Sequence, residues 1–308
     1  MKKLGFIGGG NMGEALIRGL LDRGVFAAPD LIASDIDFSR RQRLKRLFKL
    51  DVTGSNADVM RAARAILIAV KPQQIDEVLA ELNAASTPPE PARDGGRPPT
   101  PKPVALNQRL FISIVAGIPI ARIESGLSTS EGPPLPARAK SARGTRVSDS
   151  PRVIRVMPNA PAMVGEGMAA AVRGSNATRA DEAFALKLFR AVGDAIPLKD
   201  ETMLDAVTAL SGSGPAYVYL FVKAMADAGV AEGLPVELAV RMALKTIRGA
   251  ETNARQSKLG LDELIRIVAS PGGTTEAALR KFAASGFSAI VADAIHAAAQ
   301  RSRELGRA

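Results

Sequence analysis

The sequence predicts an α/β protein of two domains, in which an N-terminal parallel-sheet domain is followed by an all-α domain. Short apolar runs alternate with helical patterns through the first part of the chain, an order typical of β-α-β units. A glycine-rich turn follows the first of these runs. From about Asp200 the pattern changes to nearly continuous helix. We therefore expect one domain over residues 1–199 and a second over residues 200–308.

Short apolar runs with β-branched residues mark the expected strands of the N-terminal domain. They cover Lys3–Ile7, Leu31–Ser34, Ala65–Val70, Leu110–Val115 and Arg152–Val156. A helical pattern runs from Met12 to Leu20, and a second amphipathic helix is expected over Phe38–Leu47. Strands and helices that alternate in this way predict a parallel sheet.

Two stretches interrupt this rhythm, at residues 86–103 and 126–150. Both are rich in proline, glycine and charged or hydroxyl side chains, and both contain few apolar residues. Such segments bury too little apolar surface to offset the entropy lost on ordering. We expect two mobile surface insertions within the first domain.

The second domain is expected to consist of helices, because its apolar residues recur at helical spacing. The expected helices are Ala216–Gly229, Pro235–Ala254, Leu261–Ala269, Thr275–Ala284 and Phe287–Leu305. Many of their faces are rich in alanine, which allows helices to approach closely.

The composition argues against several classes of protein. The net charge is +10, but aromatic residues make up only 4% of the chain and there is no tryptophan. RNA-binding surfaces use stacking aromatics, and the basic residues here are scattered, so no nucleic-acid partner is expected. The charge suits solubility and the attraction of anionic ligands.

Residue counts also limit the chemistry. The chain has no cysteine and a single histidine, His296, so disulfides, thiolate nucleophiles, cysteine metal sites and multi-histidine metal sites are excluded, and no metal is expected. No run approaches the roughly 20 apolar residues of a membrane span. The basic start runs directly into glycines without the apolar core of a signal peptide, which favours a cytoplasmic protein.

The first turn has the G-x-G-x-x-G spacing, with Gly8, Gly10 and Gly13 between a strand and a helix. Gly8 suits the tight turn, Gly10 lets the backbone approach a pyrophosphate, and Gly13 lets the helix pack on the strand. Asn11 and Met12 lie at the helix N-terminus, where free amides and the helix dipole attract phosphate. The sequence therefore predicts a Rossmann-like dinucleotide-binding domain.

The second strand ends at Ser34 and Asp35, and Asp35 lies 22 residues after Gly13. A carboxylate at this point takes the ribose hydroxyls and repels a 2′-phosphate, which favours NADH. Arg40 and Arg41 follow, however, and Ser34 is a possible phosphate ligand. Asp35 or Asp37 is equally suited to cap the next helix. The preference between NADPH and NADH stays open.

Two further segments follow strand ends, where ligands of open α/β sheets bind. They contain Ala69, Val70, Lys71 and Pro72, and Ala116 and Gly117. We expect both to flank the nicotinamide ring. For Lys71 a solvated surface lysine is an alternative.

Three segments rich in glycine, proline and hydroxyl or amide side chains occur later in the chain: Val156–Pro161, Leu210–Ala216 and Ser270–Thr275. The last lies between two helices and offers free amides, a helix dipole and two threonine hydroxyls, which suit a carboxylate ligand. A Ser/Thr helix cap after a Pro-Gly turn is the alternative.

With these motifs in view, the chain resembles the pyrroline-5-carboxylate reductase family over essentially its whole length. The resemblance is carried by GFIGGGNMG, AVKP, MPNAP, ALSGSGPAYVY and SPGGTTEAAL. It implies an all-α dimerisation domain, an intertwined homodimer or higher homo-oligomer, and reduction of 1-pyrroline-5-carboxylate to L-proline by NADPH or NADH. The active site would lie between the dinucleotide-binding domain of one subunit and the helical domain contributed with its partner.

The resemblance also implies roles for particular residues. Ser270, Gly273, Thr274 and Thr275 match positions that hold the substrate carboxylate and ring nitrogen, and the Thr275 hydroxyl would reach that nitrogen. Asn56 matches a residue at the adenosine ribose, and the Met157–Pro161 loop, which contains Asn159, matches a loop near the nicotinamide.

The chain departs from the family at Ala160, where threonine is more usual, and in its two Pro-rich insertions. Two other classes of protein are alternatives. A reductase for another imine or hydroxy acid would carry a lysine base, for which Lys187 is present without a flanking motif. A non-catalytic dinucleotide-binding protein would be expected to have lost either SPGGTT or the glycine turn.

Overall fold

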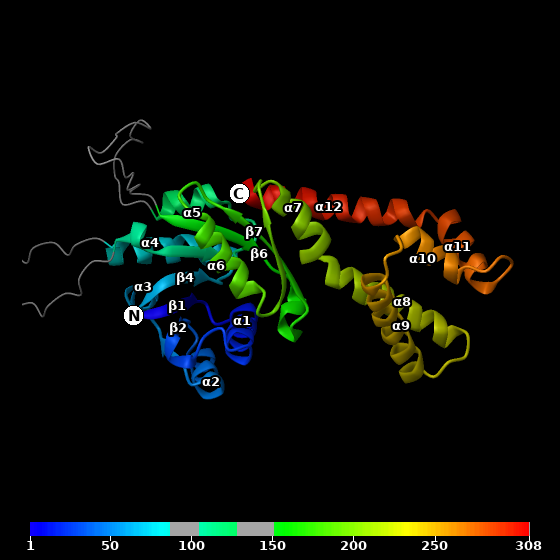
Figure 1. Ribbon diagram of the computed structural model, residues 1–308, viewed down its shortest axis with the longest axis horizontal. Coiled ribbons are helices and arrows are strands. Elements are labelled where there is room, and N and C mark those ends of the chain that lie inside the picture. Colours follow the sequence, from blue (N-terminus) through cyan, green and yellow to red (C-terminus); the bar gives the residue numbers. More distant parts are fainter. Residues whose placement is uncertain (87–104, 128–150, 308) are drawn as a thin grey trace, which may run out of the picture. The chain divides into compact units, whose positions relative to one another are not determined.

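The computed structural model describes residues 1–86, 105–127 and 151–307 (Figure 1). It divides into two compact units. The first unit contains Met1–Gly212 together with Ser302–Ala308, and the second contains Ser213–Arg301. Apart from Ser86, Gly126 and Leu127, the two predicted insertions lie outside the described residues.

The first unit is built on one eight-stranded sheet in the order β3-β2-β1-β4-β5-β6-β7-β8. The strands are β1 (Lys2–Ile7), β2 (Leu31–Ser34), β3 (Asp51–Thr53), β4 (Ala63–Ile68), β5 (Leu110–Ser113), β6 (Arg152–Met157), β7 (Gly167–Arg173) and β8 (Gly193–Leu198). The first six pair in parallel, as the sequence predicts. β7 runs antiparallel to β6, and β8 is parallel to β7. The antiparallel step involves β7, a strand that the sequence pattern does not predict.

Helices cover both faces of this sheet (Figure 1). They are α1 (Asn11–Asp22), α2 (Phe38–Phe48), α3 (Asn56–Ala62), α4 (Ile75–Ser86), α5 (Ile120–Gly126), α6 (Arg179–Phe189) and α7 (Met203–Val207). One apolar core lies against α1, α2 and α6, and the other against α3, α4 and α5. The alternation of strand side chains explains this division, because Phe6 points into the first core and its neighbour Ile7 into the second.

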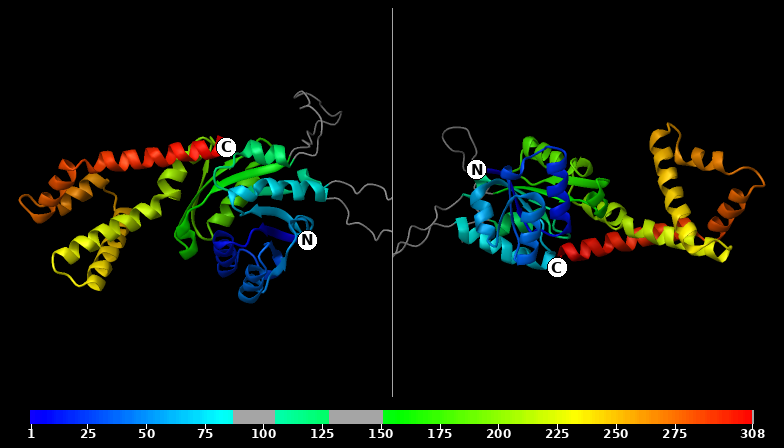
Figure 2. Two further views of the ribbon diagram at one scale, coloured as in Figure 1. Left: turned by 180° about the vertical axis from the view of Figure 1, so that it is seen from behind. Right: turned by 90° about the horizontal axis from the view of Figure 1, so that it is seen from below.

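The second unit consists of helices, as predicted. They are α8 (Gly214–Ala231), α9 (Val236–Gln256), α10 (Leu261–Val268), α11 (Thr274–Ala284) and α12 (Phe287–Arg307), whose last residues belong to the first unit. α8 and α9 pack against each other (Figure 2). The rings of Phe221, Phe282 and Phe287 form a cluster with centroids 5.3 to 6.5 Å apart.

The second unit leaves large apolar side chains in solvent. Tyr219, Leu220 and Ile290 are each more than 60% exposed. Among the described helices, none is by itself long and apolar enough to cross a membrane; α11 and residues Phe287–Gly306 meet that test only as a pair bent by 52°.

Candidate active site

The glycine turn after β1 is fixed by close backbone contacts. Gly8 has φ +97°, and a Cβ there would lie 2.6 Å from the Ala69 carbonyl oxygen, so only glycine fits without strain. The Gly8 amide donates to the Ser34 carbonyl (2.9 Å). A Cβ on Gly13 would lie 2.7 Å from the Gly8 carbonyl oxygen, which explains how α1 approaches β1 so closely.

Gly10 begins α1 and leaves its N-terminus open. It is the N-cap residue, no side chain caps the helix, and a Cβ on Gly10 would meet nothing within 4 Å. The first intrahelical bond runs from the Glu14 amide to the Gly10 carbonyl (2.8 Å). The amides of Asn11, Met12 and Gly13 therefore have no intrahelical acceptor and suit a phosphate anion.

Asp35 and Asp37 have different roles after β2. The Asp37 carboxylate caps α2, accepting from the amides of Ser39 (2.8 Å) and Arg40 (3.4 Å). Asp35 instead accepts from the Gly9 amide (2.8 Å) and from the Asp37 amide (2.9 Å). Of the two caps that the sequence left open, the structure uses Asp37, and Asp35 joins the second strand to the glycine turn.

Asn56 is held between two neighbours at the start of α3. Its Oδ1 accepts from the Ser34 hydroxyl (2.6 Å), and its Nδ2 donates to Glu81 Oε2 (2.7 Å). The Glu81 carboxylate also accepts from the backbone amides of Asn56 (3.0 Å) and Ala57 (3.3 Å). A carboxylate from α4 thus satisfies the N-terminus of α3 and orients the Asn56 side chain.

Ser34 does not face the site. Its relative exposure is 1%, and its hydroxyl is bonded to Asn56, so direct contact with a cofactor phosphate, which the sequence allowed, does not fit this geometry. Any effect of Ser34 on a ligand passes through Asn56. Glu81 carries no signal in the sequence, because nothing local to α4 indicates a partner 25 residues away.

A cleft of about 350 Å³ lies beyond the strand ends of the first unit. Its lining is Gly8, Gly10, Asp35, Ile36, Asp37, Arg40, Gly54, Asn56, Ala69, Val70, Lys71, Gln74, Glu77, Val78 and Glu81. Seven predicted cofactor residues are therefore brought together here. Asn11 lies outside this cleft and lines a second hollow with Arg18, Arg40 and Arg43.

The remaining predicted cofactor residues are absent from the lining of this cleft. Gly117 has φ +74°, and a Cβ there would lie 3.3 Å from Leu305 Cβ, near the end of α12. Asn159 is engaged within the first unit: its Nδ2 lies 3.1 Å from Ser211 Oγ and its Oδ1 accepts from the Met168 amide (2.8 Å). Asn159 thereby ties the loop after β6 to the π-helical turn Thr208–Gly212.

The Ser270–Thr275 segment of the second unit forms the turn before α11. Gly273 is the N-cap residue and no side chain caps the helix, so the predicted alternative of a Ser/Thr cap does not apply. The Gly273 amide donates to the Ser270 carbonyl (3.0 Å), and the Gly272 amide donates to Glu276 Oε2 (2.6 Å). Within the described part of the chain, the hydroxyls of Ser270, Thr274 and Thr275 make no hydrogen bond, so they are free for a ligand.

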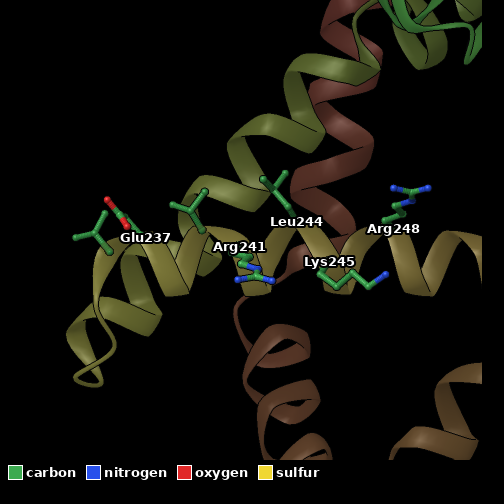
Figure 3. A pocket seen from close by; sticks show the side chains of 7 residues that line it. Glu237, Arg241, Leu244, Lys245 and Arg248 are labelled. Atoms are coloured by element: carbon green, nitrogen blue, oxygen red, sulfur yellow. The ribbon is translucent and has the colours of Figure 1, made fainter.

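A basic stretch lies elsewhere on the second unit. Arg241, Lys245 and Arg248 project from α9 beside Leu244, and the hollow they border is lined by residues of this one helix (Figure 3). It has no second wall to enclose a ligand. The described residues also include no group of three or more His, Cys, Asp or Glu side chains arranged to hold a metal ion.

A parallel sheet whose first strand ends in this glycine turn, with an open cleft beyond the strand ends, defines a dinucleotide-binding protein of the Rossmann class. Comparisons with known families agree. A family model described as "NADP oxidoreductase coenzyme F420-dependent" matches residues 3–89, and one described as "Pyrroline-5-carboxylate reductase dimerisation" matches residues 201–305.

Curated relatives extend over nearly the whole chain. A pyrroline-5-carboxylate reductase of Pseudomonas aeruginosa is 39% identical over 303 residues, covering 98% of this chain and 96% of the relative. One of Methanosarcina acetivorans is 34% identical over 306 residues, covering 99% and 98%. The chain belongs to the pyrroline-5-carboxylate reductase family.

Solved structures give the same result for the fold. A pyrroline-5-carboxylate reductase of Coxiella burnetii matches with a TM-score of 0.80 and 27% identity, covering 99% of this chain and 98% of that one. A Plasmodium falciparum pyrroline carboxylate reductase with NADP bound matches with a TM-score of 0.77 and 28% identity, at the same coverage. The Rossmann-like domain and helical dimerisation domain predicted from the sequence are confirmed.

Proposed function

We propose that this protein reduces 1-pyrroline-5-carboxylate to L-proline with NADPH or NADH, the last step of proline biosynthesis. One observation carries the proposal: the same chain combines a cleft at the glycine turn with a second-unit segment that has three unbonded hydroxyls. Relatives named for this reaction support it. The nicotinamide supplies the hydride when it is bound, so the protein has to bind, orient and polarise.

The cofactor site proposed here is centred on the glycine turn and the adjoining strand ends. Its residues are Gly8, Gly10, Asn11, Met12, Gly13, Ser34, Asp35, Asn56, Ala69, Val70, Lys71, Pro72, Ala116, Gly117 and Asn159. The free amides at the start of α1 would bind the pyrophosphate, and the Asn56 side chain would lie near the adenosine ribose. Ser34 and Asn159 would act by holding their neighbours in place.

The substrate site proposed here is the turn before α11. The hydroxyls of Ser270 and Thr274 and the backbone at Gly273 would hold the substrate carboxylate, since a helix N-terminus favours an anion. The Thr275 hydroxyl would donate to the ring nitrogen and so polarise the imine. An imine needs only a weak donor at nitrogen, which agrees with a chain that has no cysteine and one histidine.

The helical second unit is proposed to form a homodimer, or a higher homo-oligomer, by covering its exposed apolar side chains. A groove of about 380 Å³ is lined almost wholly by apolar residues, among them Leu220, Phe221, Ile290 and Val291. Exposed apolar side chains that lie together in this way are typical of a protein–protein interface. The functional division at residue 200 and a cytoplasmic location remain predictions, and we expect no nucleic-acid or membrane partner.

The direct test is a spectrophotometric assay with pyrroline-5-carboxylate and each reduced cofactor in parallel. We expect loss of absorbance at the reduced-nicotinamide band that depends on the substrate, with proline as product. The Thr275→Ala variant is the matched control, since it should keep cofactor binding while turnover falls. Oxidation of cofactor without proline formation would contradict the proposal.

A further inference from the structure

Asp35 lies at the end of the first-unit cleft that is next to β2. This side chain is half-buried and lines the cleft. Its Oδ2 accepts from the Gly9 amide and its Oδ1 from the Asp37 amide. A carboxylate oxygen accepts more than one hydrogen bond, so both oxygens retain capacity for a hydroxyl donor. These two hydrogen bonds also orient the carboxylate.

A second carboxylate, that of Glu81 on α4, lines the same cleft. Glu81 holds Asn56 through the Nδ2 bond of 2.7 Å. The Asn56 Oδ1 is already occupied by the Ser34 hydroxyl. Asn56 therefore presents a fixed amide beside a carboxylate, an arrangement that suits hydroxyl groups better than a phosphate.

Two of the residues that suggested a phosphate site are engaged elsewhere. Ser34 is buried and bonded to Asn56. Arg41 Nη1 donates to the carbonyls of Asp35 (2.6 Å) and Ile36 (3.0 Å), and its guanidinium lies 5.5 Å from the Phe38 ring centroid. Arg41 thus braces the loop after β2.

The charge that remains in the cleft is negative. Among its lining residues, the carboxylates are Asp35, Asp37, Glu77 and Glu81, and the cations are Arg40 and Lys71. Asp37, Glu77 and Lys71 are exposed, whereas Asp35, Glu81 and Arg40 are half-buried. The charges least screened by solvent are therefore two carboxylates against one guanidinium.

We propose that Asp35 makes this cleft select NADH over NADPH, with Glu81 as the residue that positions Asn56. The inference rests on the proposed function and names which of its two cofactors is used. A ribose 2′-hydroxyl can donate to the carboxylate. A 2′-phosphate carries close to two negative charges at neutral pH and would meet a carboxylate that two amides hold in place. Like charges at this range repel strongly when they are partly buried.

Equilibrium binding tests this without reliance on turnover. The purified full chain is titrated with NADH and with NADPH in the absence of substrate, following the fluorescence of the reduced nicotinamide. We expect the Kd for NADPH to be at least about tenfold higher. Competition by 5′-AMP and 2′,5′-ADP should show the same preference, because these fragments differ only in the 2′-phosphate.

Two variants assign the effect to Asp35. Asp35→Ser should bring the two Kd values to within about threefold of each other, because it removes the repulsion and one hydroxyl acceptor. Asp37→Asn is the matched control: it removes an exposed charge two residues away, keeps a good helix cap, and should change the ratio by less than about twofold.

The outcomes separate this inference from the proposed function. NADPH binding as tightly as NADH to the unaltered protein overturns the selection by Asp35, whether or not Asp35→Ser folds. An unchanged ratio in a folded Asp35→Ser variant overturns it as well. Failure of both cofactors to bind contradicts the proposed function itself.

Discussion

In the first unit the residues around the glycine turn are bonded to one another, whereas in the second unit the Ser270–Thr275 segment keeps its hydroxyls without partners. Asp35 and Asn56 each make hydrogen bonds to neighbours that fix their side chains. Ser270 and Thr274 are exposed and make no side-chain hydrogen bond in the described structure. A cofactor site is thus pre-formed within one folding unit, while the substrate segment has polar capacity left for a ligand.

Gly8 offers the strongest test of the pre-formed site. Gly8→Ala should lower the free energy of unfolding by roughly 2–4 kcal/mol, because it combines a left-handed φ with a Cβ 2.6 Å from the Ala69 carbonyl oxygen. Chemical denaturation measures this loss. Gly10→Ala is the control, because a Cβ there meets nothing within 4 Å. This variant should keep its stability, while its binding of NADH should weaken. Equal stability of the two variants would contradict this account of the turn.

Thr275 offers the corresponding test in the second unit. Thr275→Ala should lower kcat/KM for pyrroline-5-carboxylate by about 10²-fold, because a hydrogen-bond donor at the reacting nitrogen is lost. Thr275→Ser should retain activity within about fivefold, since it keeps the hydroxyl. Steady-state kinetics distinguish the two variants, and equal losses would show that the methyl group, not the hydroxyl, is needed.

The exposed apolar surface of the second unit predicts a change in assembly. Leu220 is 68% exposed, and Leu220→Lys should weaken self-association by at least about tenfold, because a charge would be buried in an apolar interface. Analytical ultracentrifugation over a concentration series measures this. Leu47→Lys makes the same change on the first unit, at a residue 41% exposed, and should leave the assembly unchanged. A Leu220→Lys protein that assembles normally would exclude this surface as the interface.

Glu81 tests whether the carboxylate on α4 supports the site. Glu81→Ala should lower the free energy of unfolding by about 1–2 kcal/mol and weaken NADH binding, because the start of α3 and the Asn56 amide lose their acceptor. Glu77→Ala, one turn earlier on α4 and exposed, is the matched control and should have little effect on stability. Thermal unfolding and cofactor titration give both readouts. If the two variants behave alike, the capping role of Glu81 is wrong.

The smallest expected effect is a change in stability at low pH. Hydrogen bonds and charge from Arg43, followed by Arg18, hold the pKa of Glu14 below its ordinary value of 4.5. A carboxylate whose pKa is lowered by folding stabilises the folded protein at pH values above its unfolded-state pKa. This stabilisation is lost as the pH falls through the lower, folded-state pKa. The unaltered protein should therefore exceed Glu14→Gln in stability at neutral pH, by less than about 1 kcal/mol, and the difference should vanish as the pH drops below 4.5. A difference that persists in acid would point to packing instead.

The elements predicted from the sequence are those with strong local signals. The apolar runs of β1, β4, β5 and β6 and the helical spacing in the second unit gave positions close to those observed. β7 was missed because its sequence, GMAAAVR, is rich in alanine, which has low strand propensity. β8 contains Pro197 and is an edge strand, where a proline is tolerated but obscures the pattern.

The site residues also divide into those with a local sequence signal and those whose partners are distant in the sequence. Spacing alone identified Gly8, Gly10 and Gly13, because the turn is local in sequence. The partners of Asn56 and Asn159 were not predicted, since Glu81 lies 25 residues from the first and Ser211 lies 52 residues from the second. Such pairs depend on how the sheet brings distant loops together. The hydrogen bond from the Ser34 hydroxyl to Asn56 on α3, 22 residues later, has no local signal in the sequence for the same reason.

A crystal structure of the full assembly with a nicotinamide cofactor and proline tests most directly whether the glycine turn and the Ser270–Thr275 segment serve one reaction. We expect the pyrophosphate at the start of α1, the proline carboxylate at the turn before α11, and proline C5 about 3–3.5 Å from nicotinamide C4. Proline bound at a site that no pairing of subunits brings near the nicotinamide would contradict the account.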